Sequence, residues 1–350
     1  MKNFIAVASC PSSGSTLVAD LLDSLPNFVC GPETSLLAVV SQLSLKSNAL
    51  DKSLISYDSC KTTLSIGINR LHEYGLTANI LKKLWAESET KDCFLGHISK
   101  RYSVFRGKPL DSYFCEKTPT NFAYSLDIAK ISSVFGMIFV IRDPLFTVTS
   151  MVKRGYSLRE ASSAWLQAAT IAYNMIRSGQ ENVAIIRYED LVLNPFQAIL
   201  TALNEMKCTL PEISIKSFEH LYESNLYRKI VSPKSIETWN VTNYGSISNA
   251  NLYISESVLK YLQNSRGLRL NNKVTFYSDL QEFPSLSELC EYFDYSFNVS
   301  ASLDSMVCHK GIQDNLRWFK CLLVYVDCIR RNPSYSLKVL RDRSKRICSF

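Results

Sequence analysis

The sequence predicts an α/β fold: a parallel sheet flanked by helices, followed by a helical C-terminal extension. Three short apolar runs, residues 4–9, 137–141 and 183–186, are the expected strands. Each run ends in small or polar residues, and apolar residues at helical spacing follow it. Strands that alternate with helices are typical of a parallel sheet covered on both faces.

The first expected strand, residues 4–9, opens directly into a loop of small residues and then into a helix. Leu17 and Leu21 begin an apolar face at helical spacing. Pro26 ends this helix, because the residue before a proline is disfavoured in the helical conformation. The chain therefore begins with a strand, a loop and a helix.

The second expected strand, residues 137–141, ends at Arg142 and leads into a helix that starts at Pro144. Proline suits the first helical position because its missing N–H needs no partner there. A long amphipathic helix is expected over residues 160–176. The third strand, residues 183–186, precedes one more helical pattern.

Two regions lack this alternation. Residues 36–110 are expected to form a mostly helical insertion, and residues 251–350 a helical extension. Within the extension, the residue pattern predicts helices over 312–323 and 334–347. We therefore expect one domain over residues 1–250 and a separate extension after it.

The composition excludes several classes of protein. Of the 350 residues, 46% are hydrophobic and 20% are charged, which excludes a disordered chain. The net charge of +7 suits an anionic ligand but is too small to indicate a nucleic acid as partner. The longest apolar runs fall far below the ~20 residues of a membrane span, so no membrane partner is expected. Eleven cysteines without a Cys-x-x-Cys pair indicate buried thiols in a reducing compartment, and hence a cytoplasmic location.

The loop after the first strand is predicted to bind an anion, as in a P-loop-type sheet. Gly14 allows a tight turn, and four neighbouring residues carry hydroxyls: Ser12, Ser13, Ser15 and Thr16. At a helix N-terminus, backbone N–H groups converge on one point and the helix dipole favours negative charge. The alternative is a serine-rich turn that only caps the helix.

The loop is not a Walker A motif. That motif needs a lysine directly after its last glycine, and here Ser15 follows Gly14. The second strand ends in Arg142, which suits an anion better than a metal ion. A P-loop kinase, which we keep as an alternative, would lack both the Walker A lysine and a strand-end aspartate that binds magnesium. No metal ion is expected.

Five short motifs follow one another along the chain: Pro11–Leu17, Cys30–Thr34, Glu116–Pro119, Ile141–Pro144 with Ser150, and Arg187–Leu191. In this order they resemble the sulfotransferases that use 3′-phosphoadenosine-5′-phosphosulfate (PAPS), in particular the tyrosylprotein sulfotransferase-like and bacterial branch. The resemblance covers about residues 4–245. It implies that residues 1–250 form a sulfotransferase domain in which residues 36–110 shape the acceptor pocket.

The resemblance implies two groups of residues that bind PAPS, the donor of the sulfuryl group. The opening loop would hold the 5′-phosphosulfate through Ser12, Ser13, Gly14, Ser15 and Thr16. Arg142 and Ser150 would grip the 3′-phosphate, since a guanidinium forms a fork of charge-assisted bonds to phosphate. The alternative is a surface ion pair between Arg142 and Asp143, beside an ordinary helix serine.

The resemblance also implies two catalytic residues. Glu33 would accept the proton of the attacking acceptor, a hydroxyl or amine of a small molecule, glycan or peptide. Lys117 would neutralise the charge that develops on the leaving phosphate. The alternatives are an acid near a helix N-terminus for Glu33 and a solvated loop lysine for Lys117.

The sequence departs from the family pattern at Ser12, where the family's loop usually carries a basic residue. Loss of such a donor typically costs about 3–4 kcal/mol of transition-state stabilisation. Lys117, Lys153 or Arg154 could supply the charge, and we expect an active enzyme because Glu33 and Lys117 are both present. The alternative is a non-catalytic nucleotide-binding protein of the same fold.

Overall fold

The computed structural model describes residues 3–42, 74–208, 216, 256–270 and 280–296. The helices predicted over 312–323 and 334–347, and part of the predicted insertion, lie outside the described residues. In chain order the elements are β1 (Phe4–Ser9), α1 (Ser15–Ser24), β2 (Phe28–Cys30), α2 (Leu36–Gln42), α3 (Ala78–Ala86), α4 (Lys91–Arg106), β3 (Tyr113–Lys117), η3 (Pro119–Tyr124), α5 (Ser125–Ala129), β4 (Val134–Ile141), α6 (Pro144–Lys153), α7 (Leu158–Arg177), β5 (Val183–Arg187), α8 (Tyr188–Leu193), α9 (Pro195–Glu205), α14 (Glu256–Asn264) and α15 (Leu286–Tyr292).

The described residues form a five-stranded sheet in the order β2-β3-β1-β4-β5, and every pair of neighbouring strands is parallel. The predicted α/β fold is therefore confirmed. β1, β4 and β5 are the three strands expected from the apolar runs. The long helix expected over residues 160–176 is α7, which starts two residues earlier, after the capping box of Ser157 and Glu160.

Sequence analysis missed β2 and β3. β2 has three residues, too few to show a pattern. β3 ends in Glu116 and Lys117, whose buried charged side chains interrupt the apolar run. The signal that remains is the β-prone sequence Tyr113-Phe114-Cys115, closed by Pro119.

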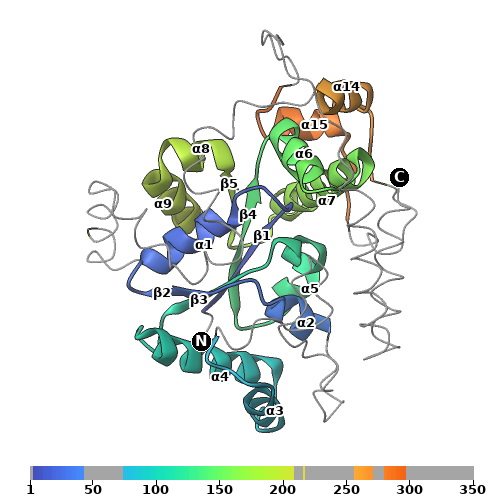
Figure 1. The fold of residues 1–350 in the computed structure, drawn as a ribbon. Helices are drawn as coiled ribbons and strands as arrows, with labels where there is room; N and C mark the ends of the chain where they lie inside the picture. Colours follow the sequence, from blue (N-terminus) through green and yellow to red (C-terminus); the bar gives the residue numbers. More distant parts are fainter. Residues whose placement is uncertain (1–2, 43–73, 209–215, 217–255, 271–279, 297–350) are drawn as a thin grey trace.

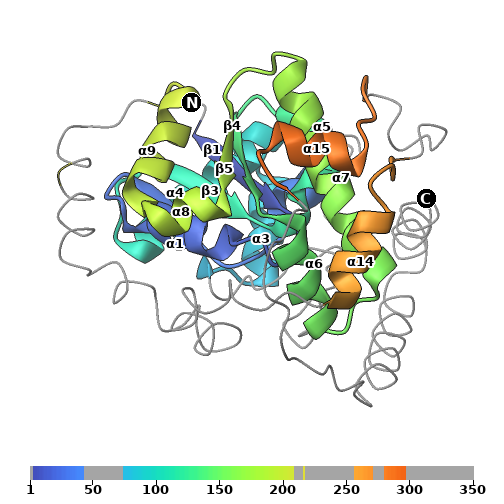
Figure 2. The same cartoon turned by 90° about the horizontal axis from the view of Figure 1, so that it is seen from above.

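Helices cover both faces of the sheet, as Figures 1 and 2 show. The alternation of side chains along β1 divides the core into two. Phe4 and Ala6 face the cluster that contains residues of α5, α6 and α7, whereas Ile5 and Val7 face the cluster of α1 and α9. This double cover is the reason that every residue of β1 is buried.

The C-terminal helices α14 and α15 pack against α6 and α7 (Figure 1). Val258 and Leu262 of α14 and Leu289 of α15 belong to the same core cluster as Trp165 of α7. The boundary predicted at residue 250 stays a prediction, but the described part of the extension shares its core with the sheet. Among the helices that the structure describes, none is both long enough and apolar enough to cross a membrane.

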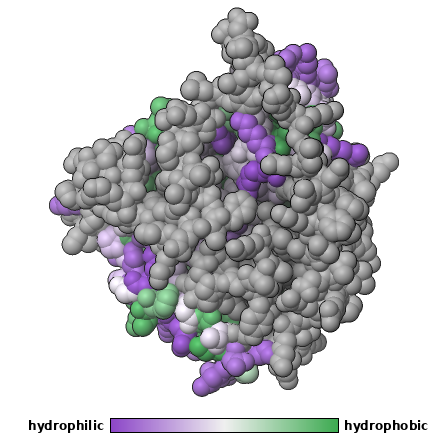
Figure 3. Space-filling model, in the orientation of Figure 1, coloured by the Kyte–Doolittle hydropathy of each residue, from purple (hydrophilic) through white to green (hydrophobic). Residues whose placement is uncertain are grey.

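At the lower left of Figure 3, the described residues that reach the surface are partly hydrophobic and partly hydrophilic. α4 lies in this part in Figure 1. Val104 and Phe105 near its end are 66% and 58% exposed, and Leu110 after it is 56% exposed. Scattered exposed apolar residues of this kind are ordinary for a folded domain.

Candidate active site

The candidate site lies where the direction of the chain crossovers reverses, between β1 and β4. From β1 the chain runs to β2 and β3 on one side, and from β4 it runs to β5 on the other. Ser9 pairs with Val140, so the two strands leave the sheet side by side. In sheets of this type, the ligand usually binds in the crevice between the loops that follow such a pair of strands.

The loop after β1 is a tight turn that only glycine allows. Gly14 has a φ of +96°, in the left-handed region, and it is the N-cap of α1. A Cβ at this position would lie 2.3 Å from Cδ2 of Tyr188. Ser12 is also left-handed, with a φ of +71°. The ring of Tyr188, which follows the third predicted strand, therefore packs onto the loop.

Ser13 lies inside the turn and is 1% exposed. Its backbone N–H donates to the carbonyl of Cys10 at 3.2 Å. Its hydroxyl has no hydrogen-bond partner among the described residues. Ser15, the first residue of α1, is also buried, and Thr16 follows it on the same helix.

Arg142 reaches this loop from the end of β4. Its Nη1 donates to the backbone oxygen of Ser12 at 3.2 Å, and its guanidinium lies 4.4 Å from the centre of the Tyr188 ring. Its backbone oxygen accepts a 2.8 Å bond from Nε1 of Trp165. Arg142 is 6% exposed, so the alternative of a surface ion pair with Asp143 is wrong. Its Nε has no partner in the described part of the chain.

A second arginine meets the loop at the position where the sequence lacks the family's basic residue. Arg154, at the end of α6, donates from Nη1 to Oγ of Ser12 at 2.7 Å. Ser150 is half-buried on the same helix, eight residues after Arg142. Two guanidinium groups therefore contact one serine, Arg142 at its backbone oxygen and Arg154 at its hydroxyl.

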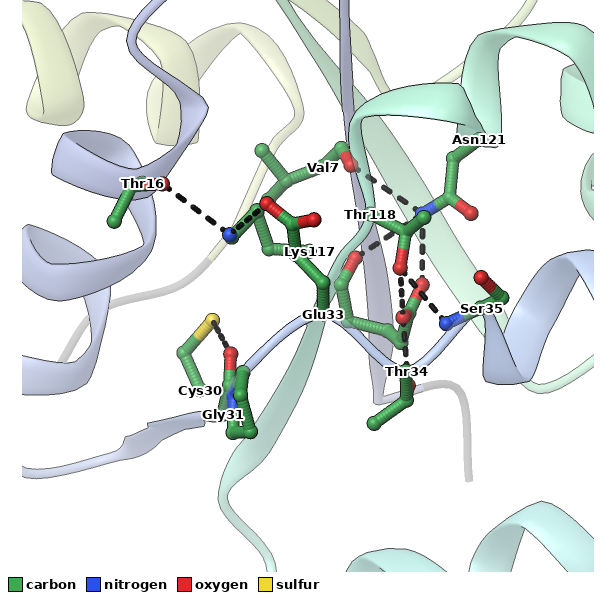
Figure 4. A network of polar contacts seen from close by, with 12 residues as sticks. Val7, Thr16, Cys30, Gly31, Glu33, Thr34, Ser35, Lys117, Thr118 and Asn121 are labelled. Atoms are coloured by element: carbon green, nitrogen blue, oxygen red, sulfur yellow. Dashed lines mark hydrogen bonds and ion pairs between the residues drawn. The ribbon is translucent and has the colours of Figure 1, made fainter. Parts of the chain in front are cut away.

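Lys117 and Glu33 form an ion pair beside the loop (Figure 4). Nζ of Lys117 lies 2.7 Å from Oε1 of Glu33 and donates to Oγ1 of Thr16 at 3.3 Å. The side chain of Lys117 is 5% exposed and that of Glu33 is 46% exposed. The interpretation of Lys117 as a solvated loop lysine is therefore wrong. An ammonium has three N–H donors, and these two bonds use two of them.

The neighbouring Glu116 is a second carboxylate of the site, and sequence analysis gave it no role. It is 0% exposed. Its Oε1 accepts bonds from the hydroxyls of Thr34 at 2.8 Å and Thr118 at 2.6 Å, and its Oε2 accepts from Nδ2 of Asn121 at 2.7 Å. Thr34 comes from the segment after β2, whereas Thr118 and Asn121 follow β3 (Figure 4). A charge buried with three donors is held far more tightly than a solvated one.

This network fixes the segment that carries Glu33. Thr34 follows Glu33 directly, and the N–H of Ser35 donates to Oγ1 of Thr118 at 2.9 Å. Ser35 has a φ of +59°, a conformation that costs free energy and persists only where neighbours impose it. Glu116 and Thr118 therefore hold the turn that points Glu33 at Lys117.

Asp143 caps the helix that follows Arg142. Its Oδ1 accepts a 2.7 Å bond from the N–H of Leu145. Burial raises the pKa of Asp143 to about 6, and the nearby charge of Glu189 adds to this, although the Leu145 bond and Arg142 lower it. This carboxyl group therefore takes up a proton at a higher pH than an ordinary aspartate.

The residues of the crevice fit a ligand with several negative oxygens. The Ser13 hydroxyl and Nε of Arg142 are buried donors that lack an acceptor among the described residues, and phosphate or sulfate oxygens are acceptors. Three cations contact the loop: Arg142 and Arg154 at Ser12, and Lys117 at Thr16. In the part of the chain that the structure describes, no group of three or more His, Cys, Asp or Glu residues could hold a metal ion.

Comparisons with known proteins agree on one family. Residues 5–207 match the model described as "Sulfotransferase family". Protein-tyrosine sulfotransferase A of Caenorhabditis elegans is 24% identical over 201 residues, which are 55% of this chain and 46% of that protein. Protein-tyrosine sulfotransferase 1 of Danio rerio is 26% identical over 207 residues, 57% of this chain and 51% of that protein. The chain thus spans about half the length of these curated relatives.

Among solved structures, the sulfotransferase domain from the curacin biosynthetic pathway is similar to this chain with a TM-score of 0.46 and 17% sequence identity. The match covers 85% of this chain and 99% of that one. The sulfotransferase STF9 from Mycobacterium avium has a TM-score of 0.35 and 12% identity, over 75% of this chain and 76% of that one.

Proposed function

Because this chain belongs to the sulfotransferase family, we propose that it moves a sulfuryl group from PAPS to a hydroxyl or amine of an acceptor. The observation that supports the donor is the direct contact between the two predicted anion-binding places. The loop after β1 and Arg142 after β4 are joined by the bond from Nη1 to the oxygen of Ser12. PAPS carries a phosphosulfate on its 5′ side and a phosphate on its 3′ side, so its binding needs two anion-binding places that lie close together.

The loop and its cations would bind the donor. Ser13, Ser15 and Thr16, with the backbone N–H groups around Gly14, would hold the 5′-phosphosulfate at the N-terminus of α1. Arg142 and Ser150 would hold the 3′-phosphate. The contact of Arg142 with the Tyr188 ring and its bond to Ser12 hold the guanidinium in place before binding, which lowers the entropy lost when it forms a fork of bonds.

Glu33 and Lys117 would carry the transfer itself. Glu33 accepts the proton of the acceptor as its oxygen or nitrogen forms a bond to sulfur. The bond between sulfur and the bridging oxygen breaks, and its electron pair stays on the phosphate of adenosine 3′,5′-bisphosphate. Lys117 donates to that developing charge. Because Lys117 already bonds to Glu33 at 2.7 Å, one ammonium holds the base and faces the leaving group.

Arg154 would supply the positive charge that Ser12 does not. A guanidinium at 2.7 Å from the Ser12 hydroxyl lies at the loop position that is basic in the related enzymes. The loop therefore keeps a cation at this point, delivered from the end of α6. This contact favours an active enzyme over a protein that only binds the nucleotide.

The acceptor to test first is a tyrosine hydroxyl in a peptide, since the curated relatives are named protein-tyrosine sulfotransferases. The chain would be incubated with ³⁵S-labelled PAPS and three acceptor classes: tyrosine peptides, glycans and small phenols. Isothermal titration with adenosine 3′,5′-bisphosphate measures donor-site binding independently. Binding with transfer supports the proposal, binding without transfer selects the non-catalytic alternative, and no binding contradicts the proposal.

A further inference from the structure

A residue far outside the family match lies directly behind Arg142. The hydroxyl of Tyr295 donates to Oε2 of Glu189 at 2.8 Å and lies 3.3 Å from the backbone oxygen of Ile141. Ile141 is the last residue of β4, one position before Arg142. Tyr295 therefore touches the end of the strand that delivers the predicted phosphate-binding arginine.

Glu189 connects Tyr295 to Asp143, the residue after Arg142. Its Oε1 accepts a 3.2 Å bond from the N–H of Asp143. The backbone around Arg142 is thus bonded at its own carbonyl by Trp165 and at the N–H of Asp143 by Glu189. Because the single proton of the Tyr295 hydroxyl goes to Glu189, Tyr295 acts on the Asp143 bond through that carboxylate, and it contacts the carbonyl of Ile141 without a second proton to donate.

The turn that carries Tyr295 is itself attached to the sheet. Nη1 of Arg187, at the end of β5, lies 3.0 Å from Oδ2 of Asp294, and its Nη2 donates to the Asp294 backbone oxygen at 3.3 Å. The same guanidinium lies 5.0 Å from the centre of the Tyr295 ring. Tyr295 is 9% exposed, and burial keeps the pKa of its hydroxyl well above the ordinary value. The hydroxyl is therefore a permanent donor near neutral pH.

We infer that Tyr295 is a positioning residue for the donor site, acting through Glu189 on the backbone that carries Arg142. This inference rests on the proposed function, because it takes Arg142 as the group that holds a phosphate of the donor. It gives a role in the site to the C-terminal segment, which lies beyond the matched residues 5–207.

The test is Tyr295→Phe in the full chain, which removes the hydroxyl and keeps the ring. Titration with adenosine 3′,5′-bisphosphate should give a dissociation constant raised about five- to twentyfold at unchanged stoichiometry. In turnover assays the KM for PAPS should rise while kcat at saturating PAPS stays within about twofold. Tyr292→Phe is the matched control, since Tyr292 contacts the rings of Tyr173 and Phe293 rather than the strand end.

Glu189→Gln is the second variant, and it should weaken binding to a similar degree because it acts on the same bonds. A variant that has merely lost structure would lower the stoichiometry and the melting temperature, whereas a positioning defect raises the dissociation constant of a fully folded chain. Wild-type affinity in Tyr295→Phe overturns the inference alone. Failure of the wild-type chain to bind overturns the proposed function, and the inference with it.

Discussion

The two sides of the crevice differ in how their polar groups are satisfied. On the β3 side, the carboxylate of Glu116 has three donors and Lys117 is bonded to Glu33 and Thr16, while Oδ1 of Asn121 is a buried acceptor without a donor among the described residues. On the β4 side, which here includes the loop after β1, the Ser13 hydroxyl and Nε of Arg142 are buried donors without an acceptor among the described residues. A buried donor left unpaired costs about 1–3 kcal/mol, so a fold that retains such donors is suited to a ligand that accepts their bonds.

This difference indicates that the two sides have different roles in the proposed reaction. The β3 side holds its groups in place through the protein's own hydrogen bonds, as a catalytic base and a charge-neutralising lysine require. The β4 side keeps donors for phosphate oxygens. Changes on the β3 side should therefore lower the rate of transfer, and changes on the β4 side should also weaken binding of the nucleotide.

Lys117→Ala should produce the largest effect. It removes the cation that faces the leaving group and also releases Glu33, so kcat should fall by roughly 10² to 10³. Initial rates with labelled PAPS measure this loss, and Ser12→Ala, which removes only a hydroxyl, should cost far less. Small and equal effects of the two substitutions would contradict the role of Lys117.

Arg154→Ala should lower turnover by about ten- to a hundredfold, because it removes the cation bonded to Ser12. Lys153→Ala changes the same net charge one position earlier and is the matched control. Both variants would be compared by kcat/KM for PAPS and by titration with adenosine 3′,5′-bisphosphate. If Lys153→Ala is the more damaging of the two, the compensating charge does not come from Arg154.

Glu116→Gln should reduce turnover about tenfold and lower stability by about 1–2 kcal/mol. The amide has the shape of the carboxylate, but one of its two oxygens becomes an NH₂ group. This change places a donor opposite the threonine and asparagine donors that bind Glu116. Thermal unfolding measures the loss of stability, and kcat measured over a range of pH measures the loss of turnover. Glu87→Gln, on the surface of the molecule, should change neither. Unaltered kcat in Glu116→Gln would show that the turn holding Glu33 does not need this network.

Asp143→Asn should give the smallest effect, and one that depends on pH. The pKa of Asp143 in the folded chain is about 6, above the ordinary 3.8, so at pH 7 to 8 the folded state carries a charge that burial disfavours. Asparagine also caps helices well, so the variant should be more stable there, by about 1 kcal/mol. As the pH falls through 6 towards 4, the wild-type folded state binds a proton before the unfolded chain does, and the advantage should disappear.

Unfolding curves at pH 5, 6, 7 and 8 test this expectation. A difference between wild type and Asp143→Asn that is constant over this range would show that the carboxyl group titrates as an ordinary exposed aspartate. A larger advantage of the variant at pH 5 than at pH 8 would reverse the predicted sign.

Much of the fold and part of the site could be predicted from local sequence. The runs that became β1, β4 and β5 are uninterrupted apolar segments, and the small residues of the loop around Gly14 mark a tight turn before a helix. β3 could not be found in this way, because its last two residues are charged and are buried only through partners from other segments. Its role in the site was correspondingly hidden: Glu116 has no local signal that distinguishes a buried network carboxylate from a solvated one.

By itself, the sequence determined three of the five strands, the tight turn before the first helix and the family of the chain, because these depend on residues close together in sequence. Only the tertiary structure decided which charges meet. Arg154 at Ser12, Lys117 at Glu33 and Tyr295 behind Arg142 join residues separated by more than 80 positions. Such contacts follow from the crossing of parallel strands and the packing of distant helices, which no local pattern encodes.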